Sequence, residues 1–289
     1  MKELKIYDVR FCPGDSAFLI DDGKTAILYD TGFGFSGYKI ADNIKKILGE
    51  RSLDFILLTH SHYDHALGSA YISERFPEAK IVAGEYAASV FPRPGAQAVM
   101  KSLDGKVAVS YGITDYEFKG DRLRADITVS DGDTVKCGDM SFTVLNLPGH
   151  TKCSVAFYCK ERELLLSCES LGVYNGRDAI IPSVLVGYND ALDSIDRVKA
   201  LSIKNILAPH FGLLDEDQTA YFLSNMKLET ERAAEFILQR LKNGMDAEKI
   251  RDEYIDAYSD SFTSEAYPRA AAELNTSIMI ELLRKEFNL

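Results

Sequence analysis

The sequence lacks any apolar stretch long enough to span a membrane, and its first residues lack the apolar core of a signal peptide. It also lacks a C-x-x-C pair, and its five cysteines are an odd number, which favours reduced buried thiols over a disulfide framework. Positive charge is scarce, with 33 Lys and Arg against 44 Asp and Glu. That deficit argues against a nucleic-acid partner, because such affinity rests on neutralising phosphates. We therefore expect a cytoplasmic protein without a membrane or nucleic-acid partner.

Apolar patterns along the 289 residues predict an α/β protein with a helical tail. Residues 92–126 break the pattern with several prolines and glycines and indicate an inserted loop or lid. We expect one domain over 1–215 and a helical C-terminal cap over 216–289, with breaks at Gly244 and Pro268. Predicted strands are 16–20, 25–29, 55–58, 80–83, 134–136, 141–147, 154–158, 163–167 and 205–208, and predicted helices before the tail are 38–48, 66–76, 85–91 and 190–201.

Histidine is rare as well, with five in the chain, and their placement is informative. Three lie in the segment 60–65, directly after the predicted strand 55–58, and the same segment holds Asp64. Imidazole and carboxylate suit zinc, iron and other transition metals, and a turn after a strand can direct side chains to two neighbouring metal positions. His150 and His210 each follow a turn-forming residue at the end of another predicted strand. The pattern indicates a metal site.

The pattern resembles the metallo-β-lactamase superfamily over roughly residues 1–212. The residues that carry the resemblance are His60, His62, Asp64 and His65 in an H-x-H-x-D-H motif, Gly68 three residues beyond it, His150 in Pro-Gly-His, His210, and the upstream turn Asp30-Thr31-Gly32. The resemblance implies a four-layer αββα sandwich with two metals at one edge between the sheets. It also implies that His60, His62 and His150 hold one metal, while Asp64, His65 and His210 hold the other.

One position departs from the family pattern, which usually has an aspartate bridging both metals. The corresponding stretch here contains Cys168 and Glu169, and the alignment favours Glu169 as the bridge. Successive side chains in extended backbone point to opposite faces, so both should not reach the site. Cys168 is the competitor because a thiolate is an excellent zinc ligand, and its other interpretation is a small buried thiol.

Two metal ions that share a water can generate a hydroxide near neutral pH, which Asp64 would orient for attack. We expect a hydrolase of a small ester, thioester or lactone, with two divalent ions, Zn first and Mn or Fe as alternatives. The other hypotheses are a phosphodiesterase, an iron-dependent oxidoreductase, and a low-turnover regulatory protein that carries metal. A homodimer is left open.

Contacts to the substrate are the least specific prediction. Tyr174, Arg177 and Tyr188 follow Glu169, where a hydroxyl or a guanidinium could meet a substrate. Each could equally be a packing tyrosine or a solvated surface charge. The tail begins soon after His210, so its apolar positions are expected to cover the metal cleft and exclude long polymers.

Overall fold

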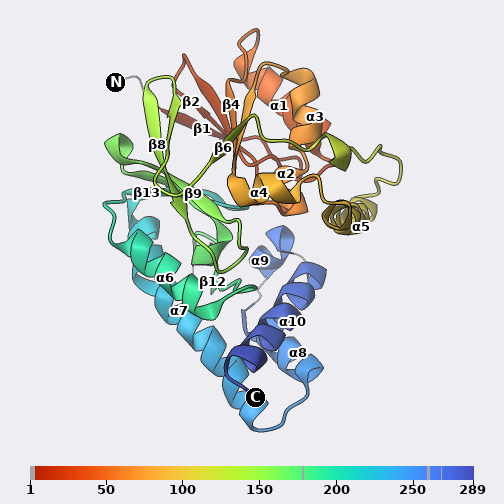
Figure 1. The fold of residues 1–289 in the computed structure, drawn as a ribbon, viewed down its shortest axis with the longest axis vertical. Helices are drawn as coiled ribbons and strands as arrows, with labels where there is room; N and C mark the ends of the chain where they lie inside the picture. Colours follow the sequence, from red (N-terminus) through yellow and green to blue (C-terminus); the bar gives the residue numbers. More distant parts are fainter. Residues whose placement is uncertain (1–3, 178, 259–260, 268) are drawn as a thin grey trace. The chain divides into compact units, whose positions relative to one another are not determined.

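The computed structural model describes residues 4–177, 179–258, 261–267 and 269–289 (Figure 1). The chain divides into two compact units, Met1–Leu145 with Phe157–Arg162, and Asn146–Ala156 with Glu163–Leu289. All five cysteines are buried thiols, as expected. Within the described residues, no helix combines the length and the apolar character needed to cross a bilayer.

The first unit is built on a six-stranded sheet in which β1, β2 and β3 are antiparallel and β3 to β6 are parallel. Residues 56–58 of β4 are completely buried, and a strand covered on both faces gives the continuous apolar run that predicts it from sequence. The strands are β1 (Lys5–Asp8), β2 (Phe18–Asp21), β3 (Ala26–Tyr29), β4 (Phe55–Leu58), β5 (Lys80–Gly84) and β6 (Ile127–Val129).

A second sheet has the hydrogen-bonded order β14-β13-β10-β9-β8-β7. In the second unit, β10 runs parallel to β13 and β14 antiparallel to it, while β11 and β12 form a small separate hairpin. These strands are β7 (Thr134–Cys137), β8 (Met140–Asn146), β9 (Val155–Cys159), β10 (Leu164–Leu166), β11 (Val173–Tyr174), β12 (Ile180–Ile181), β13 (Asn205–Ala208) and β14 (Gly212–Leu214). The carboxyl ends of β10 and β13 therefore share an edge, and Glu169 and His210 follow those ends.

Helices α1 and α3 lie side by side in the first unit (Figure 1). Gly68 precedes α3 and has to be a glycine, since a Cβ there would lie 1.9 Å from the carbonyl oxygen of Thr31. The helices up to the tail are α1 (Gly37–Leu48), α2 (Tyr63–Ala66), α3 (Ser69–Arg75), α4 (Glu85–Val90), α5 (Pro94–Ser110) and α6 (Tyr188–Lys199), with single 3₁₀ turns at Gly120–Arg122, Lys160–Arg162 and Glu169–Leu171.

Helix α5 occupies much of the segment in which the sequence predicts an inserted loop, so that prediction was wrong for the secondary structure of 94–110. Pro94 is the first helical residue, where a missing N–H costs nothing. Gly95 and Gly105 each lower helix propensity by about 1 kcal/mol relative to alanine, a cost that burial of Met100 and Ala108 on the same helix can offset. The proline and glycine content of residues 92–126 therefore predicted an irregular segment where a helix forms.

The tail belongs to the second unit and consists of α7 (Glu216–Lys242), α8 (Ala247–Tyr258), α9 (Ser261–Ala266) and α10 (Arg269–Glu286). Figure 1 shows α10 beside α8, and α7 also packs against α6. The expected break at Gly244 is confirmed by its left-handed backbone after α7. The break expected at Pro268 lies outside the described residues. Asp215 begins α7 with a reciprocal capping box to Gln218.

A buried carboxylate fastens α5 to the glycine-rich loop that follows β3. The Gly34 N–H donates to Asp104 Oδ1 over 2.9 Å, and the Tyr116 hydroxyl donates to the other carboxylate oxygen. Nearby Phe33, Phe35 and Ala108 form an apolar cluster that Tyr63 of the histidine segment also contacts. Burial raises the pKa of Asp104 from 3.8 to about 6.

This raised pKa predicts a pH-dependent stability. The folded protein holds the proton of Asp104 more tightly than the unfolded chain does, so stability falls as pH rises from about 4 to about 6. Asp104→Asn keeps the acceptor for Gly34 and removes the buried charge. As pH rises from 4 to 7, we expect the free energy of unfolding of Asp104→Asn to increase relative to that of the wild type by on the order of 2–3 kcal/mol, measured by urea unfolding. Asp115→Asn, on the exposed part of the same segment, is the control. An Asp104→Asn difference that is constant with pH would contradict the prediction.

Candidate metal centre

The histidine segment turns from β4 into the short helix α2. His62 precedes α2 with extended backbone, and Asp64 and His65 lie in the first helical turn. His60 and His65 are fully buried, whereas His62 and Asp64 are partly exposed. The ring centroid of His60 lies 4.6 Å from that of His62 and 4.1 Å from that of His65. The first unit thus gathers three imidazoles and one carboxylate in one turn.

The carboxylate of Asp30, which directly follows the neighbouring parallel strand β3, contacts this turn and orients it. Its Oδ2 lies 2.7 Å from His65 Nδ1, and its Oδ1 accepts the Thr59 N–H over 2.8 Å. A histidine whose Nδ1–H donates to a carboxylate presents the lone pair of Nε2 to a metal. The Asp-Thr-Gly turn therefore also orients a candidate metal ligand, because its Asp30 contacts the ring of His65, 35 residues later in the chain.

In the second unit, His150 follows a turn that only glycine permits. Gly149 has φ +138°, and a Cβ on it would lie 2.7 Å from Ala191 of α6. The imidazole of His150 is 1% exposed, and its Nε2 lies 2.8 Å from Glu169 Oε2. Its other nitrogen, Nδ1, lies 2.9 Å from the hydroxyl and 3.0 Å from the carbonyl oxygen of Ser183.

Glu169 places its two carboxylate oxygens toward two different histidines. Oε2 faces His150, and Oε1 lies 3.4 Å from Nε2 of His210, which directly follows β13. Glu169 is 3% exposed. Cys168 is completely buried, and it belongs to neither group of metal-ligand side chains. This geometry favours Glu169 over Cys168 for the bridging position.

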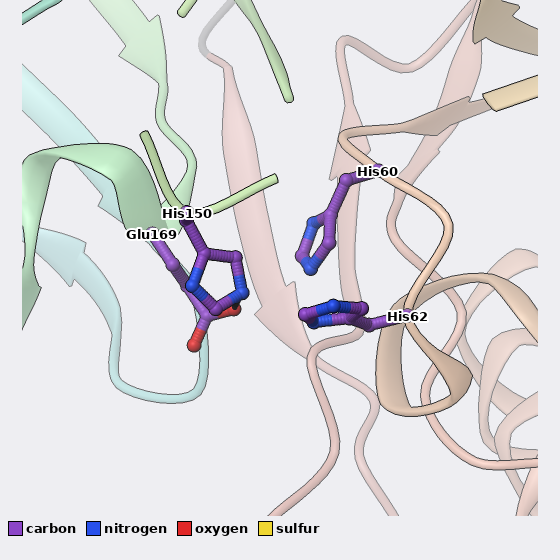
Figure 2. A group of neighbouring side chains, drawn as sticks. All are labelled: His60, His62, His150 and Glu169. Carbon is purple, nitrogen blue, oxygen red and sulfur yellow. Dashed lines mark ion pairs between the residues drawn. The ribbon is translucent and has the colours of Figure 1, made fainter. Parts of the chain in front are cut away.

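The structure holds two groups of side chains with the donors and spacing to bind metal ions. The ligand atoms of His60, His62, His150 and Glu169 all lie within 4.8 Å of one another, and those of Asp64, His65 and His210 do so as well. Figure 2 labels the four side chains of the first group, of which His60 and His62 come from the turn after β4 and His150 and Glu169 from the second unit. Imidazole nitrogens and carboxylate oxygens suit zinc, manganese and iron, so these residues fit the divalent ions expected from the sequence.

The three residues predicted to contact a substrate have different surroundings. Tyr174 is 2% exposed, stacks on Phe222 and donates its hydroxyl to the Arg177 carbonyl over 3.0 Å, which favours a packing role. Tyr188 packs against the tail, with its ring centroid 5.9 Å from that of Phe287. Arg177 is exposed, and its guanidinium carbon lies 3.6 Å from the centroid of the Phe262 ring.

Residues that orient the histidines are the part that sequence reasoning missed. Ser183 contacts the His150 ring, and the Ser170 hydroxyl accepts the His150 N–H over 3.1 Å. Serines occur throughout the chain, so nothing in their pattern distinguishes these two. The orienting role of Asp30 had a visible signal, because it stands at the end of a predicted strand beside the histidine segment.

Comparison with protein families and curated relatives gives consistent matches. The family model described as Metallo-beta-lactamase superfamily matches residues 12–210. Glyoxylase B2 of Dictyostelium discoideum is 30% identical over 142 residues, or 47% of this chain and 44% of the relative. Hydroxyacylglutathione hydrolase of Photorhabdus laumondii is 32% identical over 105 residues, or 36% of this chain and 29% of the relative. The chain thus spans less than half the length of these two relatives.

A longer match and two solved structures extend the comparison. An acyl-coenzyme A thioesterase of Homo sapiens is 24% identical over 221 residues, covering 72% of this chain and 77% of that protein. A metallo-β-lactamase family protein from Thermus thermophilus superposes with a TM-score of 0.67 at 22% identity, covering 98% of this chain and 94% of the other. An archaeal superfamily protein from Sulfolobus tokodaii gives 0.61 at 18% identity, with 99% of each chain covered. These two likenesses, with the helices after residue 216, confirm the expected fold class.

Proposed function

Since this chain belongs to the metallo-β-lactamase superfamily, we propose that it is a binuclear metal-dependent hydrolase of a small thioester or ester. The observation that carries the proposal is the placement of Glu169, whose two oxygens face His150 and His210, one from each ligand group. A carboxylate in that position can bind two cations at once. The names of relatives favour a thioester, because two of them are described as hydrolases of hydroxyacylglutathione and of acyl-coenzyme A.

Two divalent ions held by these residues would supply Lewis acidity and a water of lowered pKa. The protein's own part is to fix the ligands and to handle the proton. Asp30 and Ser183 hold the rings of His65 and His150 by their Nδ1 atoms, so each Nε2 faces the centre. Asp64 is partly exposed, so its carboxylate can orient the attacking water and accept its proton.

Contacts within the second unit support a role for the tail in substrate binding. Phe262 of α9 lies 5.9 Å, centroid to centroid, from Phe211, the residue after the proposed ligand His210. Thr263 accepts a hydrogen bond of 3.4 Å from Asn175 in the hairpin that follows Glu169. The tail therefore touches two of the segments that carry ligands of this unit, those that follow Glu169 and His210. We propose that it caps the cleft and selects small substrates.

Arg177 places a positive group against Phe262 of the proposed cap. Among the described residues, no carboxylate forms an ion pair with its guanidinium, which rests on the Phe262 ring. An arginine held on an aromatic face keeps its planar donors available for a carboxylate or a phosphate. We propose that the preferred thioester carries such an anionic group in its leaving portion.

Metal analysis combined with a substrate panel tests the proposed function. Protein purified without added metal should contain about two metal equivalents and hydrolyse anionic thioesters faster than neutral esters, lactones or phosphodiesters. Chelation should abolish turnover, and Zn, Mn or Fe should restore it. One equivalent or less that added metal does not raise would count against the binuclear site. Oxygen consumption would indicate an iron oxidoreductase, preferred phosphodiester cleavage a phosphodiesterase, and bound metal without turnover a regulatory protein.

A further inference from the structure

The Pro-Gly-His turn is held by one short segment, residues 183–186, between the hairpin β11–β12 and helix α6. The backbone N–H groups of Leu185 and Val186 donate to the Gly149 carbonyl over 2.9 and 3.0 Å. Ser183 adds two contacts to the next residue, since its hydroxyl and its carbonyl oxygen both lie within 3.0 Å of His150 Nδ1. The backbone and the ring of this turn therefore depend on the same segment.

The residue after Ser183 points into a different environment. Val184 is 4% exposed and belongs to one apolar core cluster together with Ala191 of α6 and buried residues of three tail helices. These are Ala233, Ala234, Ile237 and Leu238 of α7, Ile250 and Tyr254 of α8, and Met279, Ile280 and Leu283 of α10. Consecutive residues thus connect the His150 ring to the core of the helical tail.

The space between Ser183 and the tail is nearly filled. Ser183 lines a cavity of ≈ 10 Å³ together with Tyr254 of α8 and Asn275 and Thr276 of α10. That volume suffices for about one water molecule. A closely packed interior transmits small displacements, so a shift of α8 or α10 is felt at Ser183.

We propose that Ser183 is a positioning residue for the His150 ligand and that the tail helices set its position through Val184. With Nδ1–H donating to Ser183, the lone pair of Nε2 is directed toward Glu169 and the metal. The tail then acts on metal affinity as well as on substrate selection. This inference rests on the proposed metal-binding function.

Zinc affinity, measured by competition with a chromophoric chelator, tests the inference without any substrate. Ser183→Ala should weaken Zn²⁺ binding about 10-fold, the lower end for loss of an orienting partner, because the Ser183 carbonyl remains. Ser183→Thr restores a hydroxyl and should recover most of the affinity. The matched control is Ser194→Ala, which removes a buried hydroxyl that donates to the Pro148 carbonyl of the same turn but does not touch the ring. It should change the affinity less than about 3-fold.

The coupling to the tail is tested by a second pair of variants. Val184→Ala should weaken Zn²⁺ binding by about 3-fold or more, whereas Val198→Ala, which removes the same two methyl groups from buried α6, should not. Melting temperatures of the metal-free variants show whether the two substitutions destabilise the fold equally. Affinities equal to that of the wild type in both Ser183→Ala and Val184→Ala would overturn the inference. A wild-type protein that binds none of Zn, Mn and Fe would defeat the proposed function itself, so the two failures are distinguishable.

Discussion

His62→Ala is expected to remove one of two metal equivalents and to lower turnover by about 10²–10³-fold or more. His62 contributes a nitrogen to the group that also contains His60, His150 and Glu169, and of these four only Glu169 is proposed to reach the second position as well. The second group can therefore keep its ion while the first loses it. His62 is partly exposed and precedes α2 in extended backbone, so alanine there should leave the fold intact.

Metal content by elemental analysis and turnover of the best thioester from the panel measure this effect together. Ser61→Ala is the control, because it alters the same turn and belongs to neither ligand group. The control should retain two equivalents and most of the activity. If His62→Ala kept both metals and full turnover, the assignment of the first ligand group would be wrong. A folded variant that lost both ions would mean that the two positions fill cooperatively.

The ligand-type residues could be predicted because strand ends and rare residues leave strong signals. The buried run of β4 and the five histidines at similar positions are visible without coordinates. The carboxylate-bearing segment after β10 follows the same rule. These features depend on local sequence, so a linear pattern is enough to find them.

Other parts depend on packing between distant segments, which a single sequence does not reveal. Helix α5 forms despite its glycines because its other face, with Met100, Asp104 and Ala108, is buried. The short strand β14 forms by pairing with β13, and it had no pattern of its own that predicted it. Ser183 acquires its place from a fold that brings it to a ring 33 residues away. Such roles follow from tertiary contacts, which override local propensity.

The bridging position supplies the second large effect, because Glu169→Gln removes one negative charge that two cations would share. We expect it to weaken binding at both metal positions and to lower turnover by about 10²-fold or more. Glutamine keeps the length and the hydrogen-bonding capacity of the side chain, so the loss would report the charge itself. Glu169→Asp keeps the charge and shortens the reach by one methylene, so it should retain part of the activity.

Cys168→Ser is the control for Glu169→Gln, because it tests the competing ligand. Cys168 is completely buried next to Glu169 and lies outside both ligand groups, so serine should change metal affinity less than about 3-fold. The reverse ranking, with Cys168→Ser abolishing metal binding and Glu169→Gln nearly silent, would make the thiolate the ligand. The choice also bears on the metal, since thiolate would favour zinc strongly. A donor set of imidazole and carboxylate alone leaves manganese and iron as competitors of zinc. Because Cys168 is not a ligand in this assignment, elemental analysis of the Cys168→Ser protein should give the same metals as the wild type.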